Sequence, residues 1–193
     1  MKIRTGFVSN SSSSSFVVAF PRKPESVDDV KKMLFDKDQT HYKHPYGTWE
    51  DGKEKDVVYP VDRVAETVWE DIKHQDPNNM EAIYESISCG WFDEFDGLSG
   101  HIDEYGNIWD AKYSTNHLDY SNPDDKKKID EIWKAREEES DRRAKEIADR
   151  FMAKCEDMFV YVFEYSDNDS IYHAALEHGD LFKKLFNIRT SYH

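Results

Sequence analysis

The sequence is poor in cysteine and has no long apolar run. Its two cysteines, Cys89 and Cys155, stand far apart, which excludes a scaffold held by several disulfides and a cysteine-rich zinc site. They predict two reduced thiols, with a single disulfide as the alternative. No stretch approaches the about 18 apolar residues of a membrane-spanning helix. No apolar signal segment follows the first residues, so we expect a cytoplasmic protein with no membrane partner.

Basic residues are also in short supply. The 26 Lys and Arg residues face 40 Asp and Glu residues, which leaves a net charge of −14. General binders of the nucleic-acid backbone neutralise phosphates with Lys and Arg, so direct nucleic-acid binding is not expected. The imbalance is local, because residues 61–122 hold fourteen acids and three bases, whereas residues 1–24 hold four bases and no acid. The excess of acidic residues therefore predicts a negatively charged surface formed by residues 61–122, rather than negative charge spread evenly over the protein.

Aromatic residues, by contrast, are abundant. The chain has 11 Tyr, 11 Phe and 5 Trp, too many for a disordered acidic chain. Residues 16–20 and 159–165 are apolar and aromatic enough for β-strands, and the second run is typical of a central strand. Apolar spacing predicts an amphipathic helix over residues 61–72 and a long helix with a polar middle around residues 123–157. A short strand over residues 188–192 is expected to complete the chain.

This order of elements predicts an α+β fold. We expect a small mixed β-sheet built from N- and C-terminal strands and packed with several helices, in a single domain of residues 1–193. Residues 36–60 show no clear period and are expected to be irregular, with a short strand over residues 57–59 as the alternative. Residues 90–122 are acidic, aromatic and punctuated by glycine, which predicts an insertion that contains a β-hairpin over residues 101–109.

The oddest feature is a run of small polar residues between two apolar segments near the N-terminus. Such a run is typical of a loop whose hydroxyl and N–H groups can hold a ligand or accept a modification. It lacks the Gly-Lys-Ser/Thr of a phosphate-binding loop and the Gly-x-Ser-x-Gly of a nucleophile turn. A flexible or locally capped loop is the alternative. The candidate ligand or modification residues are Ser9, Asn10, Ser11, Ser12, Ser13, Ser14 and Ser15.

The two ends of the chain carry a resemblance. The opening MKIRTGFVSNSSSSSF resembles the first residues of many proteins of tailed bacteriophages, bacteria and archaea that have no established activity. The closing segments FEYSDND, ALEHGD and RTSYH are similar to an ending in some of the same proteins, except that Tyr192 departs from their final Ser-His-His. The resemblance implies a phage or prokaryotic origin, so the expected location is the cytoplasm of a prokaryotic host. It also implies a core in which the N- and C-terminal segments pair. It transfers no functional residue.

A second cluster lies near the C-terminus. If the strands at residues 16–20 and 159–165 are neighbours, the serine run lies near acidic and imidazole groups. These groups suit a general base or a small ligand pocket, although their spacing matches no metal motif, so no metal and no cofactor is predicted. A turn followed by a helix cap is the alternative. The candidate pocket residues are Glu177, His178, Asp180 and His193.

The predicted insertion offers a third candidate. Acidic surfaces with interspersed aromatics suit a basic partner, because charge steers the encounter and aromatic rings dominate binding energy. Such a surface can also imitate nucleic acid and inhibit a nucleic-acid-binding protein. The alternative is that the rings are core and the acids are merely solvated. The candidate surface residues are Trp91, Phe95, Asp96, Asp103, Glu104 and Trp109.

Two functional hypotheses follow. The first is a phage-encoded acidic interaction protein that binds or inhibits a basic phage or host protein. The second is a small enzyme or ligand-binding protein whose pocket joins Ser9–Ser15 to the C-terminal Glu, His and Asp cluster. No reaction is identified, so enzymatic activity is undecided, with the first hypothesis favoured.

Overall fold

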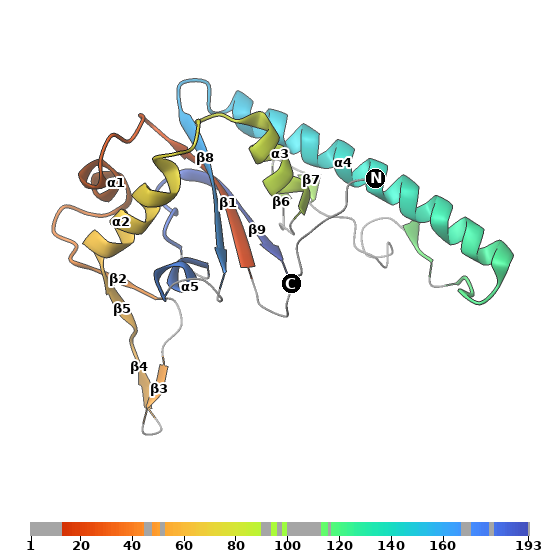
Figure 1. The fold of residues 1–193 in the computed structure, drawn as a ribbon, viewed down its shortest axis with the longest axis horizontal. Coiled ribbons are helices and arrows are strands. Elements are labelled where there is room, and N and C mark those ends of the chain that lie inside the picture. The colour runs from red at the N-terminus through yellow and green to blue at the C-terminus, as the bar shows by residue number, and fades with distance from the viewer. Residues whose placement is uncertain are drawn as a thin grey trace.

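The computed structural model describes residues 13–44, 48–50, 53–89, 94–95, 98–99, 113–115, 117–166, 171–177 and 180–192. Helices and strands alternate irregularly along the chain, as an α+β fold requires (Figure 1). In chain order they are β1 (Ser13–Phe20), α1 (Val27–Leu34), β2 (His41–Lys43), β3 (Thr48–Glu50), β4 (Lys53–Lys55), β5 (Val58–Pro60), α2 (Val61–Ile72), α3 (Met80–Cys89), β6 (Glu94–Phe95), β7 (Leu98–Ser99), α4 (Pro123–Ala153), β8 (Phe159–Ser166), α5 (Ile171–Glu177) and β9 (Phe186–Tyr192).

The central sheet joins the two ends of the chain in the order β8-β1-β9. Phe16 lies opposite Phe163 on one side and opposite Arg189 on the other. The α+β class and the pairing of N- and C-terminal strands are thus confirmed. Both ladders are antiparallel, so the expected mixture of parallel and antiparallel pairs is not found among the described strands. β1 is the central strand, and the more apolar β8 lies at an edge.

Alternate residues of β1 face two different cores. Phe16, Val18 and Phe20 point into a cluster with α1, α2 and α5, as the two-residue period of a strand requires. Val17 and Ala19 point into a second cluster with α3 and α4. Figure 1 shows the sheet between these two groups of helices. Burial on both faces explains why the strand sequences are almost continuously apolar.

The helices begin where capping residues precede an amphipathic run. The Ser26 hydroxyl accepts a hydrogen bond from the Asp29 N–H at the start of α1. In α2, Val61, Val64, Ala65, Val68 and Ile72 are buried, so the predicted helix over these residues is confirmed. α4 starts with an Asn122 cap and with Pro123 in its first turn, where the missing N–H costs no helical hydrogen bond.

The long helix α4 packs only in part against the sheet. Its buried residues in the second half are Ala144, Ile147, Ala148 and Phe151, whereas Ile129 alone is buried in the first half. The first half extends past the sheet, as the green end of the ribbon in Figure 1 shows. The helix ends at Ala153, before the predicted limit at residue 157, because residues 154–157 form a turn.

Residues 36–60 contain more order than the sequence predicted. β2 pairs with β5, and β3 pairs with β4, so the described residues 41–44, 48–50 and 53–60 contain two antiparallel strand pairs, called the ribbon below, rather than an irregular excursion. Its strands are only three residues long, which is too short for an alternation of apolar and polar residues to be visible. The ribbon leads away from the sheet in Figure 1.

The predicted insertion at residues 90–122 is described only in pieces, among them the short β6–β7 pair with Glu94 opposite Ser99. The predicted hairpin over residues 101–109 lies outside the described residues, and the single-domain assignment stays a prediction. In the described part of the chain, no helix has both the length and the apolar character to cross a membrane.

Candidate functional site

The C-terminal part of the serine run is a strand, not a loop. Ser13–Ser15 belong to β1 and pair with both β8 and β9, so the predicted loop is wrong for these three residues. Ser14 and Ser15 are buried and do not offer accessible hydroxyls to a modifying enzyme. Sequence reasoning failed here because serine favours turns, whereas two neighbouring strands and local hydrogen-bond partners hold this segment extended. Ser9, Asn10, Ser11 and Ser12 lie outside the described residues.

The Ser15 side chain belongs to a buried hydroxyl cluster on the α3 side of the sheet. Its Oγ lies 2.6 Å from Ser86 Oγ and donates to the Phe163 carbonyl at 3.1 Å. Thr190 Oγ1 lies within 3.5 Å of the main-chain carbonyls of Ser15 and Ser86. Ser15, Ser86 and Thr190 are all buried. The cluster joins β1, α3 and β9, so its role is structural.

Ser14 points to the opposite face, where it meets the C-terminal cluster. Arg189 Nη2 donates to Ser14 Oγ at 3.2 Å and to the Glu177 carbonyl at 3.0 Å. The same guanidinium carbon lies 5.6 Å from the centroid of the Phe16 ring. Arg189 therefore joins β1, β9 and the end of α5. Sequence reasoning did not select Arg189, although its place in the similar C-terminal segment was a signal.

The predicted C-terminal pocket is only partly described. Glu177 is the last residue of α5 and is fully buried, while Asp180 is exposed and its carboxylate pairs with Lys183 at 2.7 Å. His178 and His193 lie outside the described residues. The structure thus brings Ser14 and the Glu177 carbonyl to one guanidinium. This arrangement links β1, β9 and α5. It does not resemble a nucleophile with a general base, nor a metal site.

The predicted interaction surface falls mainly outside the described residues. Trp91, Asp96, Asp103, Glu104 and Trp109 lie there, and Phe95 belongs to β6 without a described side chain. The longest described part of the acidic segment is residues 61–89, which hold seven acids and two bases on α2, α3 and the loop between them. The acids are Asp62, Glu66, Glu70, Asp71, Asp76, Glu81 and Glu85.

Some of these acids line a groove between α2, α3 and β8. We call this depression the β8 groove; its volume is about 530 Å³, within the range of ligand-binding cavities. Its charged residues are all acidic, and none of its lining residues is Lys or Arg. The lining residues are Asp71, His74, Gln75, Asp76, Asn79, Ala82, Val162, Phe163 and Glu164.

One wall of the β8 groove is the outer edge of the sheet, and two amides cover part of it. The Gln75 side chain accepts from the Val162 N–H at 3.3 Å and donates to the Val162 carbonyl at 2.9 Å. Asn78 pairs with both main-chain groups of Val160, through its own N–H and through its Oδ1, each at 2.8 Å. These contacts take the place of a fourth strand beside the first half of β8.

Asn78 makes these contacts from an unusual backbone conformation. Its φ is 61°, in the left-handed region that Asn tolerates better than most residues. Pro77 precedes Asn78, after α2 has already ended at Ile72. Nothing in the sequence indicated that this segment would cover a strand edge.

Asp71 is held at the groove by two neighbours from other elements. Tyr165 Oη donates to Asp71 Oδ2 at 3.1 Å, and His173 Nε2 lies 3.4 Å from Asp71 Oδ1. Burial of Tyr165 raises the pKa of its hydroxyl well above 10.0, and the Asp71 charge raises that pKa further. Tyr165 therefore stays a hydrogen-bond donor, which keeps the Asp71 carboxylate oriented between α2, β8 and α5.

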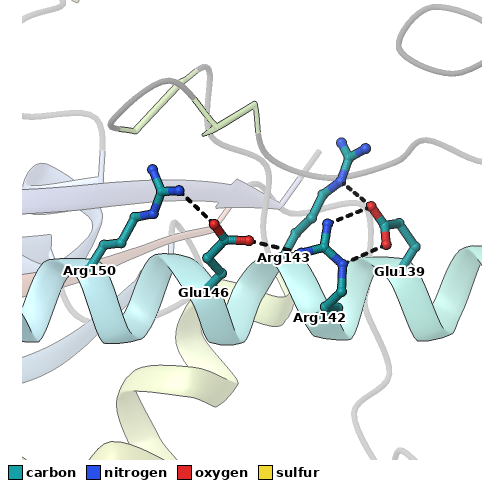
Figure 2. Close-up of polar contacts among 5 residues, drawn as sticks. All are labelled: Glu139, Arg142, Arg143, Glu146 and Arg150. Atoms are coloured by element: carbon teal, nitrogen blue, oxygen red, sulfur yellow. Dashed lines mark hydrogen bonds and ion pairs between the residues drawn. The ribbon is translucent and has the colours of Figure 1, made fainter.

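The polar middle of α4 uses its charges internally. Arg142 binds Glu139 through two contacts of 2.8 Å and reaches Glu146 at 2.9 Å, and Arg150 binds Glu146 at 2.6 Å (Figure 2). Arg143 adds a contact to Glu139 at 3.0 Å. The two arginines, Arg142 first, lower the pKa of Glu139 to about 2 against the opposing effect of desolvation. These acids are neutralised along the helix by Arg142, Arg143 and Arg150.

An aromatic pair lies near the projecting half of α4. Tyr120 and Trp133 have ring centroids 6.1 Å apart and remain 57% and 41% exposed. The apolar spacing of the helix placed Trp133 on its buried face, but that half of the helix has no sheet to pack against. The pair lies next to the partly described insertion.

Comparison with known proteins adds no relative to these observations. A scan against protein-family models found no match, and searches of the curated proteins and of the solved structures found none. Among the residues that the structure describes, no three His, Cys, Asp or Glu side chains are grouped as metal ligands require.

Proposed function

We propose that this chain is a non-enzymatic interaction protein, of phage or prokaryotic origin, that binds a basic protein partner through the β8 groove. The observation that carries the proposal is the one-sided charge of this groove. Asp71, Asp76 and Glu164 line it, and no lining residue is Lys or Arg. A cationic side chain that enters the groove meets the exposed carboxylates of Asp76 and Glu164. The Asp71 carboxylate, by contrast, already contacts Tyr165 and His173.

The surroundings of the groove support the same kind of partner. Residues 61–89 carry seven acids against two bases, although Asp62, Glu66 and Glu70 on α2 are each paired with a Lys or Arg. A local field of one sign speeds the encounter with an oppositely charged protein and repels acidic competitors. A nucleic-acid-binding protein is one class of basic partner that would present a matching surface.

The apolar part of the groove lining also favours Lys and Arg side chains. Among the lining residues, Ala82 and Val162 are partly buried and add apolar surface beside the carboxylates, whereas the Phe163 side chain is buried. The methylene groups of Lys and Arg pack against such apolar surface while their charged ends reach carboxylates. Charge and shape therefore favour the same side chains.

Affinity capture with three baits tests the proposal. The first bait is the wild-type chain, and the second is the groove variant D76K/E164K. The third is the matched control D130K/E137K, which changes the net charge equally but at exposed positions on α4. Captured proteins from phage-infected prokaryotic cells are quantified by mass spectrometry.

We expect a basic protein that the wild type and the α4 control retain and that the groove variant loses. The purified partner should then bind the wild type more weakly as salt concentration rises, because exposed charges are screened within about 10 Å at 0.1 M salt. If every captured basic protein binds the groove variant and the wild type equally, the β8 groove is not the binding site and the proposal is wrong.

A further inference from the structure

The outer edge of β8 is covered for only part of its length. Val160 and Val162 direct their N–H and carbonyl groups away from β1, because Asn78 and Gln75 bind them from outside the sheet. In an antiparallel ladder, residues two apart direct these groups to the same side. The main-chain groups of Glu164 therefore also point outward, beyond the two covering amides.

At Glu164, the main-chain groups on the outer edge of β8 are not covered by the described part of the chain. Within the described ranges, neither its N–H nor its carbonyl has a hydrogen-bond partner, and the residue is exposed. Glu164 also lines the β8 groove. An exposed strand edge with unpaired main-chain groups is a template for pairing with another extended segment.

We infer that the partner segment binds in extended form and adds to β8 at Glu164, with its basic side chains against Asp76 and Glu164. This inference rests on the proposed function and specifies how the basic partner is held. Main-chain hydrogen bonds to Glu164 supply affinity, and the acidic rim selects the side chains, as in other cases of strand addition. Gln75 and Asn78 set one limit of the added strand, because they already occupy the edge at Val162 and Val160.

Charge excludes a second copy of the chain as the occupant. Pairing two β8 edges at Glu164 would bring the two acidic rims together without an intervening cation from the groove lining. Like charges opposite each other in a sheet are destabilising. The net charge of −14 adds a general repulsion between copies.

The probe for this inference is a short synthetic peptide in which Lys and Thr alternate. Two further versions are N-methylated, one on every Lys amide and the other on every Thr amide. In an extended strand the Lys amides all point to one edge and the Thr amides to the other. N-methylation on the edge that meets β8 removes the donors and adds bulk, whereas N-methylation on the other edge leaves the pairing intact.

We expect the unmodified peptide and one methylated version to bind the full chain, and the other version to lose about tenfold or more in affinity, equivalent to about 1.4 kcal/mol. In the bound state, amide exchange at Glu164 should slow by about tenfold or more, as a newly paired N–H requires. Exchange at Val160 and Val162, whose N–H groups are already bonded, should change little.

The outcomes separate the two proposals. Equal affinity of the two methylated versions, or unchanged exchange at Glu164 in the bound state, overturns strand addition. If the bound peptide is then still lost from D76K/E164K and kept by D130K/E137K, the acidic groove remains the binding site. If the peptide does not distinguish these two variants, both proposals fail.

Discussion

The Ser15 hydroxyl lies 2.6 Å from the Ser86 hydroxyl, and this contact ties the central strand to α3 across 71 residues of sequence. Both side chains are buried, and because the Ser15 hydroxyl also donates to the Phe163 carbonyl, it is the Ser86 hydroxyl that depends on this contact. The contact explains why a serine occupies the middle of a buried strand. It also shows that part of the serine run serves the fold, whatever Ser9–Ser12 do.

The first prediction concerns this pair. S15A should lower the free energy of unfolding by about 1–3 kcal/mol, because it leaves the Ser86 hydroxyl buried without its partner. S86A should cost less, because the Ser15 hydroxyl keeps the Phe163 carbonyl as its acceptor. The double variant should cost less than the sum of the two, with a coupling of about 1 kcal/mol, measured by urea denaturation.

The matched control is S88A, two residues along the same helix, whose Oγ donates to the carbonyl of Glu85 at an exposed position. It should change stability by less than about 0.5 kcal/mol. Strict additivity of S15A and S86A would contradict the direct contact between the two hydroxyls.

The second prediction concerns the cover of the β8 edge by Asn78. N78G keeps the left-handed backbone accessible but removes the side-chain acceptor of the Val160 N–H. N78A removes that acceptor and also strains the backbone, so it should be less stable than N78G by about 1 kcal/mol. Thermal or urea unfolding of the two variants measures the difference. Equal stabilities would mean that the φ of 61° is not kept in solution.

The third prediction concerns the charge network of α4. The pKa of Glu139 lies at about 2, below its ordinary 4.5, so its ionised form stabilises the folded state above pH 4.5. That contribution is lost as the pH falls toward 2. E139Q should therefore cost about 1 kcal/mol near neutral pH, after allowance for solvent screening, and progressively less below pH 4.5.

The control for Glu139 is E138Q. Glu138 lies on the exposed side of α4 and contacts Lys134 at 3.8 Å, so its loss should have little effect at any pH. Circular dichroism during denaturation at several pH values gives both stabilities. A cost of E139Q that stays constant from pH 7 to pH 2 would contradict the assigned network.

The fourth prediction concerns Cys155. Burial raises the pKa of its thiol to about 11, so the reactive thiolate is scarce at pH 8. Iodoacetamide should label Cys155 in the folded chain about a hundredfold more slowly than in the urea-unfolded chain, because both the pKa and access change on unfolding. Peptide mass spectrometry separates this label from that on Cys89. Similar labelling rates in both states would show that the thiol is accessible.

The sequence predicted the architecture well because its strongest signals are apolar. The amphipathic period of residues 61–72 and the apolar strand at residues 159–165 each correspond to a helix or strand of the structure. The sequence-based prediction was wrong where hydrogen bonds to residues in other strands determine the local structure. Ser13–Ser15 became strand because β8 and β9 flank them, and the ribbon of residues 41–60 became ordered through cross-strand pairing.

The candidate site was less predictable for a related reason. The excess of acid in residues 61–122 was visible in the sequence, but its proximity to Glu164 depends on a sheet edge more than ninety residues beyond α2. Nor could the sequence show that Gln75 and Asn78 cover one part of this edge and leave Glu164 open. Arg189, which binds Ser14 and the end of α5, joins residues that only the fold brings together.

The most direct test of a basic-partner site at the β8 groove is the affinity of the Lys-Thr peptide for three proteins, measured by isothermal titration calorimetry. These are the wild type, D76K/E164K and D130K/E137K, of which the two variants have the same net charge. The proposed site predicts a loss of about tenfold or more in the groove variant and a change of less than about threefold in the α4 variant. Equal losses in the two variants would contradict it, because binding would then follow net charge rather than the groove.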